Sequence, residues 1–187
     1  MSPGPAFDPD GAVRFDLRSG ATSDARGSRL VLVPSTAFEA LERTTPAVLT
    51  QLGAEIGRAA GARVAARLGG GDGVRASTLE IVVAHLAGEL ALTGLGVVHL
   101  ERYNRALVLV VTNAVLASDA FVGAILSGAI AAAAGREVAV GAIGREGDVA
   151  RYFVGSAETV ARVRALLGEG RPWTEVLHLL HASAGKR

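Results

Sequence analysis

Three side chains near the C-terminus have the types and spacing of a metal site. Glu175, His178 and His181 follow one another at intervals of three residues, and a carboxylate with two imidazoles is a common zinc ligand set. Glu175 and His178 fall opposite the apolar stripe of the same predicted helix, however, and His181 lies to one side of it. No other cluster in the sequence completes the set. We therefore interpret these residues as a solvated helix face and predict no metal site.

The other motifs that could carry out chemistry are incomplete. The chain has no cysteine, which excludes thiolate nucleophiles, disulfides and Cys-ligated zinc. Ser127 precedes a glycine, but no Gly-x-Ser-x-Gly elbow surrounds it, and it lies inside a predicted helix. The glycine run at residues 69–73 lacks the Gly-Lys-Ser/Thr end of a phosphate loop and predicts a flexible connector. We expect a non-enzymatic protein that needs no cofactor.

Two polar residues lie four positions apart on a helix predicted from Ser77 or Thr78 to residue 92. His85 and Glu89 could form a ligand pair, but they fall off the apolar stripe of this helix. A hydrogen-bonded i,i+4 pair at the protein surface is the better interpretation. His99 alternates with apolar neighbours in a predicted strand, which is typical of a structural histidine.

Composition narrows the classes of function. Half of the 187 residues are hydrophobic and 20% are charged, as in a globular domain with a core. The net charge of +1 argues against a nucleic-acid-binding face. No apolar run reaches the roughly 18–20 residues that a membrane-spanning helix needs, and the N-terminal region lacks the apolar core of a signal peptide. We expect a cytoplasmic protein without a membrane span.

Four predicted strands around one helix form the centre of the fold. Residues 96–102 and 105–111 are β-rich runs at hairpin spacing, and residues 137–143 and 149–154 predict two more strands around a Gly-Asp turn. A helix of small residues, 119–135, lies between the two pairs. The run at 105–111 is apolar on both faces, which is typical of a strand covered on both sides.

The chain is predicted to begin with a flexible segment and to continue as one domain. Residues 1–28 are rich in Pro, Gly and Asp, with one short strand at 12–17 and a loop at 19–28. The single domain covers residues 29–187 and begins with a strand at 29–33.

A long helix predicted at residues 46–68 carries three glycines on one face. Gly53, Gly57 and Gly61 are spaced four residues apart. Each glycine costs about 0.5–1 kcal/mol relative to alanine in a helix interior, so three in register indicate that another backbone approaches closely. That backbone could belong to a helix of the same chain or to a second subunit. The three glycines are therefore our interface candidates.

The order of these elements resembles the 4-vinyl reductase-type or hydrocarbon-binding domain family, which is structurally related to the Bet3-like subunits of the transport protein particle. The resemblance covers roughly residues 29–154. Its matching pieces are RLVLVPSTAFEAL at 29–41, GAEIGRAAG at 53–61, GLGVVHLE at 94–101, ALVLVVTNAVLA at 106–117, GAILSGAIAAAAGREVAV at 123–140 and EGDVARYFV at 146–154.

One departure from the family pattern affects the expected chemistry. The pattern places a cysteine before the Gly-Asp turn and another after it, and Ile143 and Arg151 stand at those positions here. Gly147, Asp148 and Phe153 of the pattern remain. Metal or thiol chemistry attributed to the cysteines of relatives cannot occur in this chain.

The resemblance implies an α/β (α+β) fold, in which an antiparallel sheet of about four to five strands carries helices mainly on one side. It implies a homodimeric, non-enzymatic module that binds or senses an apolar or lipid-like small molecule. The alternative is a scaffold or adaptor that works through contacts with a protein partner. In the first case the helices over 79–92 and 119–134 would line the pocket against the sheet. The candidate lining residues are Val82, Leu86, Leu90, Phe121 and Ile125.

Overall fold

The computed structural model describes residues 7–103 and 106–184, with side chains up to residue 180. The described helices are α1 (Ser35–Thr44), α2 (Pro46–Arg67), α3 (Gly70–Ala76), α4 (Leu79–Leu92), α5 (Asp119–Ala134), α6 (Ala157–Gly168) and α7 (Trp173–Ala184). The described strands are β1 (Val13–Asp16), β2 (Ala21–Asp24), β3 (Arg29–Leu30), β4 (Val97–Tyr103), β5 (Ala106–Thr112), β6 (Ala139–Glu146) and β7 (Val149–Gly155).

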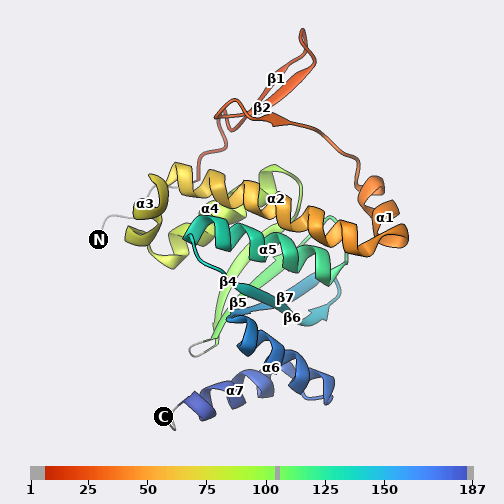
Figure 1. Cartoon of the computed structure of the whole chain (residues 1–187), viewed down its shortest axis with the longest axis vertical. Coiled ribbons are helices and arrows are strands. Elements are labelled where there is room, and N and C mark those ends of the chain that lie inside the picture. The colour runs from red at the N-terminus through yellow and green to blue at the C-terminus, as the bar shows by residue number, and fades with distance from the viewer. Residues whose placement is uncertain (1–6, 104–105, 185–187) are drawn as a thin grey trace.

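A four-stranded antiparallel sheet with the strand order β4–β5–β7–β6 lies at the centre of the fold (Figure 1). The two hairpins join where β5 pairs with β7, which places Leu109 opposite Tyr152. The register of β6 against β7 is interrupted by a bulge between Ala142 and Gly144. The strands predicted between residues 96 and 154 and their antiparallel arrangement are confirmed. The predicted hairpin turn includes Asn104, which lies outside the described residues.

Helices cover both faces of this sheet, with the larger layer on one side. α2, α4 and α5 lie over one face, and α6 and α7 lie over the other (Figure 1). Strand β5 serves both layers: Leu109 and Val111 belong to the cluster under α4 and α5, whereas Val108 and Val110 belong to the cluster under α6 and α7. All four side chains are buried. The prediction that this strand is covered on both sides is confirmed, and so is the α+β fold class.

Helices α2 and α5 approach so closely that their contact requires glycine. A Cβ atom on Gly57 would lie 2.1 Å from the carbonyl oxygen of Ile125, and one on Gly53 would lie 2.8 Å from the Phe121 ring. Gly61 meets the backbone of α5 in the same way. The face formed by Gly53, Gly57 and Gly61 is therefore filled by α5 of the same chain. This is the intramolecular alternative of the two that the sequence left open, and a second subunit could reach these glycines only if α2 and α5 separated.

The first three strands form a separate antiparallel sheet, with the order β1–β2–β3, that projects from the helical layer (Figure 1). We call residues 12–33 the N-terminal arm. The predicted strand at 12–17 is present as β1. The prediction of a loop at 19–28 was wrong, because β2 lies within it and pairs with both β1 and β3. Its sequence, Ala-Thr-Ser-Asp, has no apolar alternation. The strand is defined by backbone pairing and by the buried Asp24 carboxylate, which accepts hydrogen bonds from the Arg26 and Ser28 amides.

The prediction of a flexible connector at residues 69–73 was also wrong, because the short helix α3 begins within this run. Val74 of this helix is buried. The Ser77 hydroxyl donates a hydrogen bond of 2.8 Å to the Gly73 carbonyl where α3 ends. Tertiary packing therefore overrides the poor helix propensity of the glycines.

Candidate binding site

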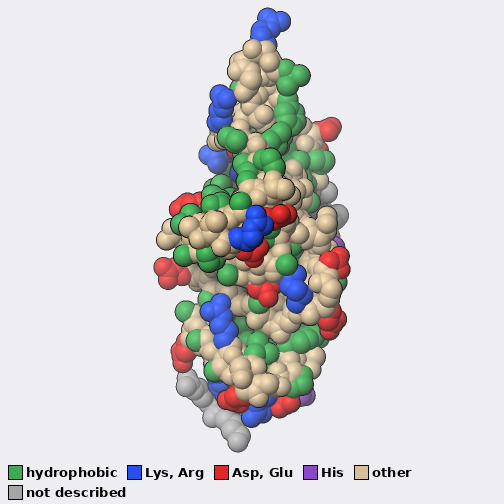
Figure 2. Space-filling model, turned by 90° about the vertical axis from the view of Figure 1, so that its right-hand side faces the viewer, with side chains coloured by type: hydrophobic (Ala, Val, Ile, Leu, Met, Phe, Trp, Pro, Cys, Tyr) green, Lys and Arg blue, Asp and Glu red, His purple; other side chains and the backbone are tan. Residues whose placement is uncertain are grey.

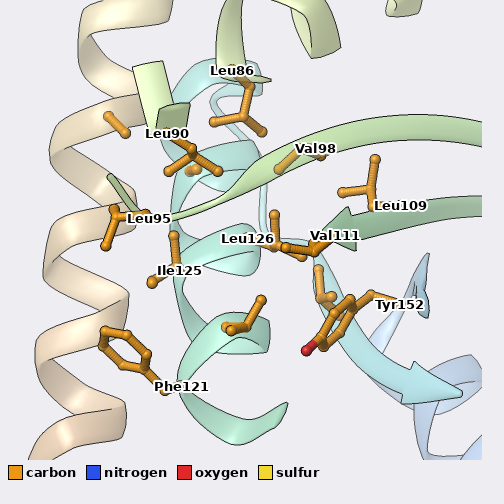
Figure 3. Close-up of a cluster of buried hydrophobic side chains, with 14 of the residues drawn as sticks. Leu86, Leu90, Leu95, Val98, Leu109, Val111, Phe121, Ile125, Leu126 and Tyr152 are labelled. Carbon is orange, nitrogen blue, oxygen red and sulfur yellow. The ribbon is translucent and has the colours of Figure 1, made fainter. Parts of the chain in front are cut away.

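The five residues predicted to line a pocket belong to the hydrophobic cluster of the helical layer and the sheet. Figure 3 shows Leu86 and Leu90 of α4 near the sheet, whereas the Phe121 ring lies between α5 and α2. There it meets Gly53 and lies 5.6 Å from the Phe38 ring. Four of the five side chains are 0–3% exposed, and the fifth, Val82, is half-buried at the edge of the cluster. Sheet and loop residues complete the surroundings: Leu95, Val98, Leu109 and Val111. The space between α4, α5 and the sheet is filled by these side chains in this structure.

Helix caps and turns fix the elements that carry these residues. The Ser118 hydroxyl accepts a hydrogen bond from the Phe121 amide and so begins α5, which ends at Gly135 with the left-handed φ of 65°. After α4, the Leu95 amide donates to the Leu90 carbonyl at 2.9 Å. That turn directs the chain from α4 into β4. Both sides of the interior therefore have defined positions relative to the sheet.

One polar group borders this apolar interior. The Tyr152 side chain is fully buried, and its hydroxyl donates a hydrogen bond of 3.0 Å to Oδ1 of Asp119. Arg145 forms an ion pair with the same carboxylate. Burial, together with the negative charge of Asp119, raises the pKa of the Tyr152 phenol far above its usual value, although Arg145 acts in the opposite direction. Tyr152 is therefore a neutral hydrogen-bonding group at physiological pH.

Two adjoining hollows lie elsewhere, along the edge strand β6 and the outer side of α5. They measure about 910 Å³ and about 590 Å³ and share Ala124, Ser127 and Ala139 in their lining. The Ser127 hydroxyl donates a 2.6 Å hydrogen bond to the Val138 carbonyl. None of the five predicted pocket residues lines either hollow. The sequence analysis missed this region, although the small residues of α5 were a signal of close packing or free space.

The interpretation of His85 and Glu89 as a surface pair was wrong. His85 is 3% exposed and Glu89 is fully buried. The two carboxylate oxygens of Glu89 accept hydrogen bonds from the Nε groups of Arg63, at 2.6 Å, and Arg67, at 2.9 Å. Both arginines lie on α2, so the polar partners come from a neighbouring helix. The four-residue spacing of Arg63 and Arg67 was the available sequence signal.

Two of the three candidate metal residues near the C-terminus, Glu175 and His178, have described side chains, and both are exposed. Glu175 accepts a hydrogen bond from Arg171 at 3.0 Å, and the side chain of His181 lies outside the described part of the chain. Among the described side chains, those of residues 7–103 and 106–180, no group of three His, Cys, Asp or Glu could hold a metal ion. No helix in the same part of the chain is long and apolar enough to span a bilayer.

Comparison with solved structures finds a protein of similar fold, although comparison of the sequence alone finds no relative. No protein-family model matches the sequence, and no curated protein matches it either. Among solved structures, the chain is similar to the phenol-responsive sensory domain of the transcription activator PoxR, crystallised with phenol. The TM-score is 0.58 at 13% sequence identity, and the match covers 86% of this chain and 92% of that domain. At this identity the likeness establishes a shared fold.

Proposed function

We propose that this chain is a non-enzymatic module that binds or senses a small apolar or lipid-like molecule, and that it is of the 4-vinyl reductase type. The observation that carries the proposal is the likeness of its fold, over most of its length, to a phenol-responsive sensory domain. The apolar interior at the positions named from the sequence supports it. A cytoplasmic location and independence from cofactors and nucleic acid belong to the same proposal.

The proposed site is the interior between α4, α5 and the sheet. Leu86, Leu90 and Ile125 supply apolar contacts. The Tyr152 hydroxyl, whose proton is donated to Asp119, can accept a hydrogen bond from a hydroxyl group of the ligand. Because these side chains are packed together, a ligand can enter only if they move apart. The favourable term is burial of the ligand's apolar surface, about 25 cal/mol per Å².

The test is extraction of the purified chain with organic solvent followed by mass spectrometry, together with melting curves in the presence of phenol and of toluene. We expect an apolar molecule in stoichiometric amount, or an increase in melting temperature with at least one of the two compounds. Ile125→Phe fills the proposed site and should abolish that increase. Val176→Ile adds bulk to the cluster on the other face and should retain it. A clean extract and unchanged melting of the unmodified chain would contradict the proposal.

A second function, assembly through protein contacts, is favoured by the N-terminal arm. Its exposed large apolar side chains are Phe15 (61%), Leu17 (90%), Val31 (77%), Leu32 (76%) and Val33 (48%). Figure 2 shows hydrophobic side chains along this projection. Contiguous apolar surface of this kind marks an interaction site in soluble proteins. We propose that the arm is the homodimer contact, which is compatible with a sensory role.

A further inference from the structure

The aromatic ring of Phe7 occupies a notch between the end of α2 and the outer side of α4. A Cβ atom on Gly88 would lie 2.3 Å from the ring, so the glycine is what makes room for it. The Arg67 guanidinium lies over the ring, 4.8 Å from its centroid, and the His85 ring meets it edge-on at 6.2 Å. The Asp8 carbonyl accepts a hydrogen bond from Arg67. The chain therefore holds an aromatic ring in a slot with a cationic wall.

The wall of this slot carries one positive charge in excess. Arg63 and Arg67 both bind Glu89, and two cations against one carboxylate leave a net charge of +1. Both guanidinium groups retain some exposure, 15% and 26% of their side chains, whereas the carboxylate is buried. Each arginine uses its Nε for Glu89, and Nη1 of Arg67 donates to the carbonyl of Asp8, the residue next to Phe7. Displacement of Phe7 together with Asp8 would free that nitrogen for a ligand. Guanidinium groups suit a second carboxylate.

We infer that this notch is a binding site for a small aryl carboxylate, and that Phe7 is an intramolecular occupant that competes with it. The ligand's ring takes the place of the Phe7 ring, over Gly88 and under Arg67, with the cation–π contact preserved. Its carboxylate binds the outer nitrogens of Arg67 and Arg63. The site lies on the outer side of α4 and is separate from the apolar interior proposed above, so it does not rest on that proposal.

Competition between Phe7 and an added ligand sets how much the apparent affinity for the ligand should change when Phe7 is removed. The apparent affinity for an added ligand falls in proportion to the fraction of molecules in which the site is free. If Phe7 fills the notch in about nine-tenths of the molecules, its removal tightens binding about tenfold. Phe7 lies shortly before β1 in the chain, so displacement of the ring also releases the segment that leads into the N-terminal arm. Binding is thereby linked to the position of the arm.

The experiment is calorimetric titration of the full chain with benzoate, with benzyl alcohol and acetate as comparison probes. We expect Phe7→Ala to bind benzoate about tenfold more tightly than the unmodified chain. Benzyl alcohol lacks the charge and acetate lacks the ring, so both should bind at least tenfold more weakly than benzoate. Val48→Ala, which removes an exposed apolar side chain at the opposite end of α2 from Arg67, should bind benzoate as the unmodified chain does.

A second variant tests whether benzoate binds in the notch. In the Phe7→Ala background, Gly88→Leu fills the vacated slot, and the atoms nearest to the new Cβ all belonged to Phe7, so the fold accommodates it. Benzoate binding should then be lost. Equal benzoate affinity with and without Phe7, or binding that survives in the Phe7→Ala, Gly88→Leu double variant, would overturn the inference. Equal affinity for benzoate and benzyl alcohol would overturn the part that concerns the carboxylate.

Discussion

At the scale of single residues, the crossing of α2 and α5 depends on the absence of a Cβ atom at Gly57. The Cβ of Gly57→Ala would lie 2.1 Å from a backbone oxygen of α5, and backbone cannot rotate aside as a side chain can. We expect the variant to lose about 3 kcal/mol of unfolding free energy, as overpacking in a core typically does. Urea denaturation measures the loss.

The matched control is Gly168→Ala at the end of α6. A Cβ there meets nothing within 4 Å, and alanine is the better helix former by about 0.5–1 kcal/mol. This variant should be as stable as the unmodified chain or slightly more stable. If Gly57→Ala behaved like Gly168→Ala, the close approach of α2 and α5 would be wrong.

A second residue-scale prediction concerns alkaline pH. The raised pKa of Tyr152 means that the folded chain keeps the phenolic proton above pH 10, whereas the unfolded chain releases it near its ordinary pKa of about 10. The unfolded state therefore binds fewer protons, and the unfolding free energy falls as pH rises above 10. By about pH 11 the loss from this group approaches about 1.4 kcal/mol.

Absorbance of the phenolate isolates this group. The chain has two tyrosines, and the pKa of Tyr103 is also raised, mainly by burial, so Tyr103→Phe leaves Tyr152 as the only reporter. At about pH 11 the folded Tyr103→Phe variant should show little phenolate, and urea should reveal it. Tyr152→Phe should remove the corresponding loss of stability. Ionisation of Tyr152 in the folded state at pH 10 would contradict the buried hydrogen bond to Asp119.

At the scale of elements, strong apolar patterns predicted the structure and polar patterns did not. The four strands of the central sheet and the helices at 46–68 and 119–135 follow from local sequence, because burial there repeats with the period of the element. β2 and α3 were missed, since one is defined by backbone pairing and the other by packing against α2 and α5. Neither cause is visible in a short window of sequence.

The same difference between apolar and polar patterns holds for the candidate site. The burial of Leu86, Leu90 and Phe121 in one cluster could be predicted from the sequence, because each lies on the buried side of its own helix. The burial of Glu89 could not be predicted, because its partners Arg63 and Arg67 lie on another helix. A residue's own helix decides its apolar face, but the neighbouring helix decides whether a charge can be buried.

A prediction at this scale concerns the docking of α7 on the sheet. Val176 is fully buried in the cluster beneath α6 and α7, and an unpaired carboxylate there costs several kcal/mol. Val176→Asp should release α7 while the layer of α2, α4 and α5 stays folded, because the two clusters lie on opposite faces of the sheet. Trp173 is the only tryptophan and packs edge-on against Tyr103 at 4.9 Å. Its emission should shift to the red.

The control for α7 is His178→Asp, a change at an exposed position of the same helix. It should leave the tryptophan emission as it is in the unmodified chain. Unchanged emission in Val176→Asp would mean that α7 is not held by this cluster. Hydrogen exchange should place the loss of protection in α6 and α7.

At the scale of the whole molecule, the fold separates three surfaces. The apolar interior lies under α4 and α5, and the notch filled by Phe7 is formed by Gly88 of α4 and Arg67 of α2. The N-terminal arm projects away from the helical layer (Figure 1). The segment from Phe7 to β1 connects the second surface to the third. If both proposals hold, a molecule bound at the notch should influence assembly through this segment without any change in the sheet.

The last prediction tests assembly through the arm. Val31→Asp with Leu32→Asp places two carboxylates on side chains that are 77% and 76% exposed, so the fold of the monomer should be unaffected. The unmodified chain should sediment as a dimer and the double variant as a monomer, because the apolar contact loses its favourable burial and gains like charges in its place. Arg18→Asp, also on an exposed part of the arm, changes charge without removing apolar surface and should remain dimeric. If the unmodified chain sediments as a monomer, or the double variant as a dimer, the arm is not the contact between subunits.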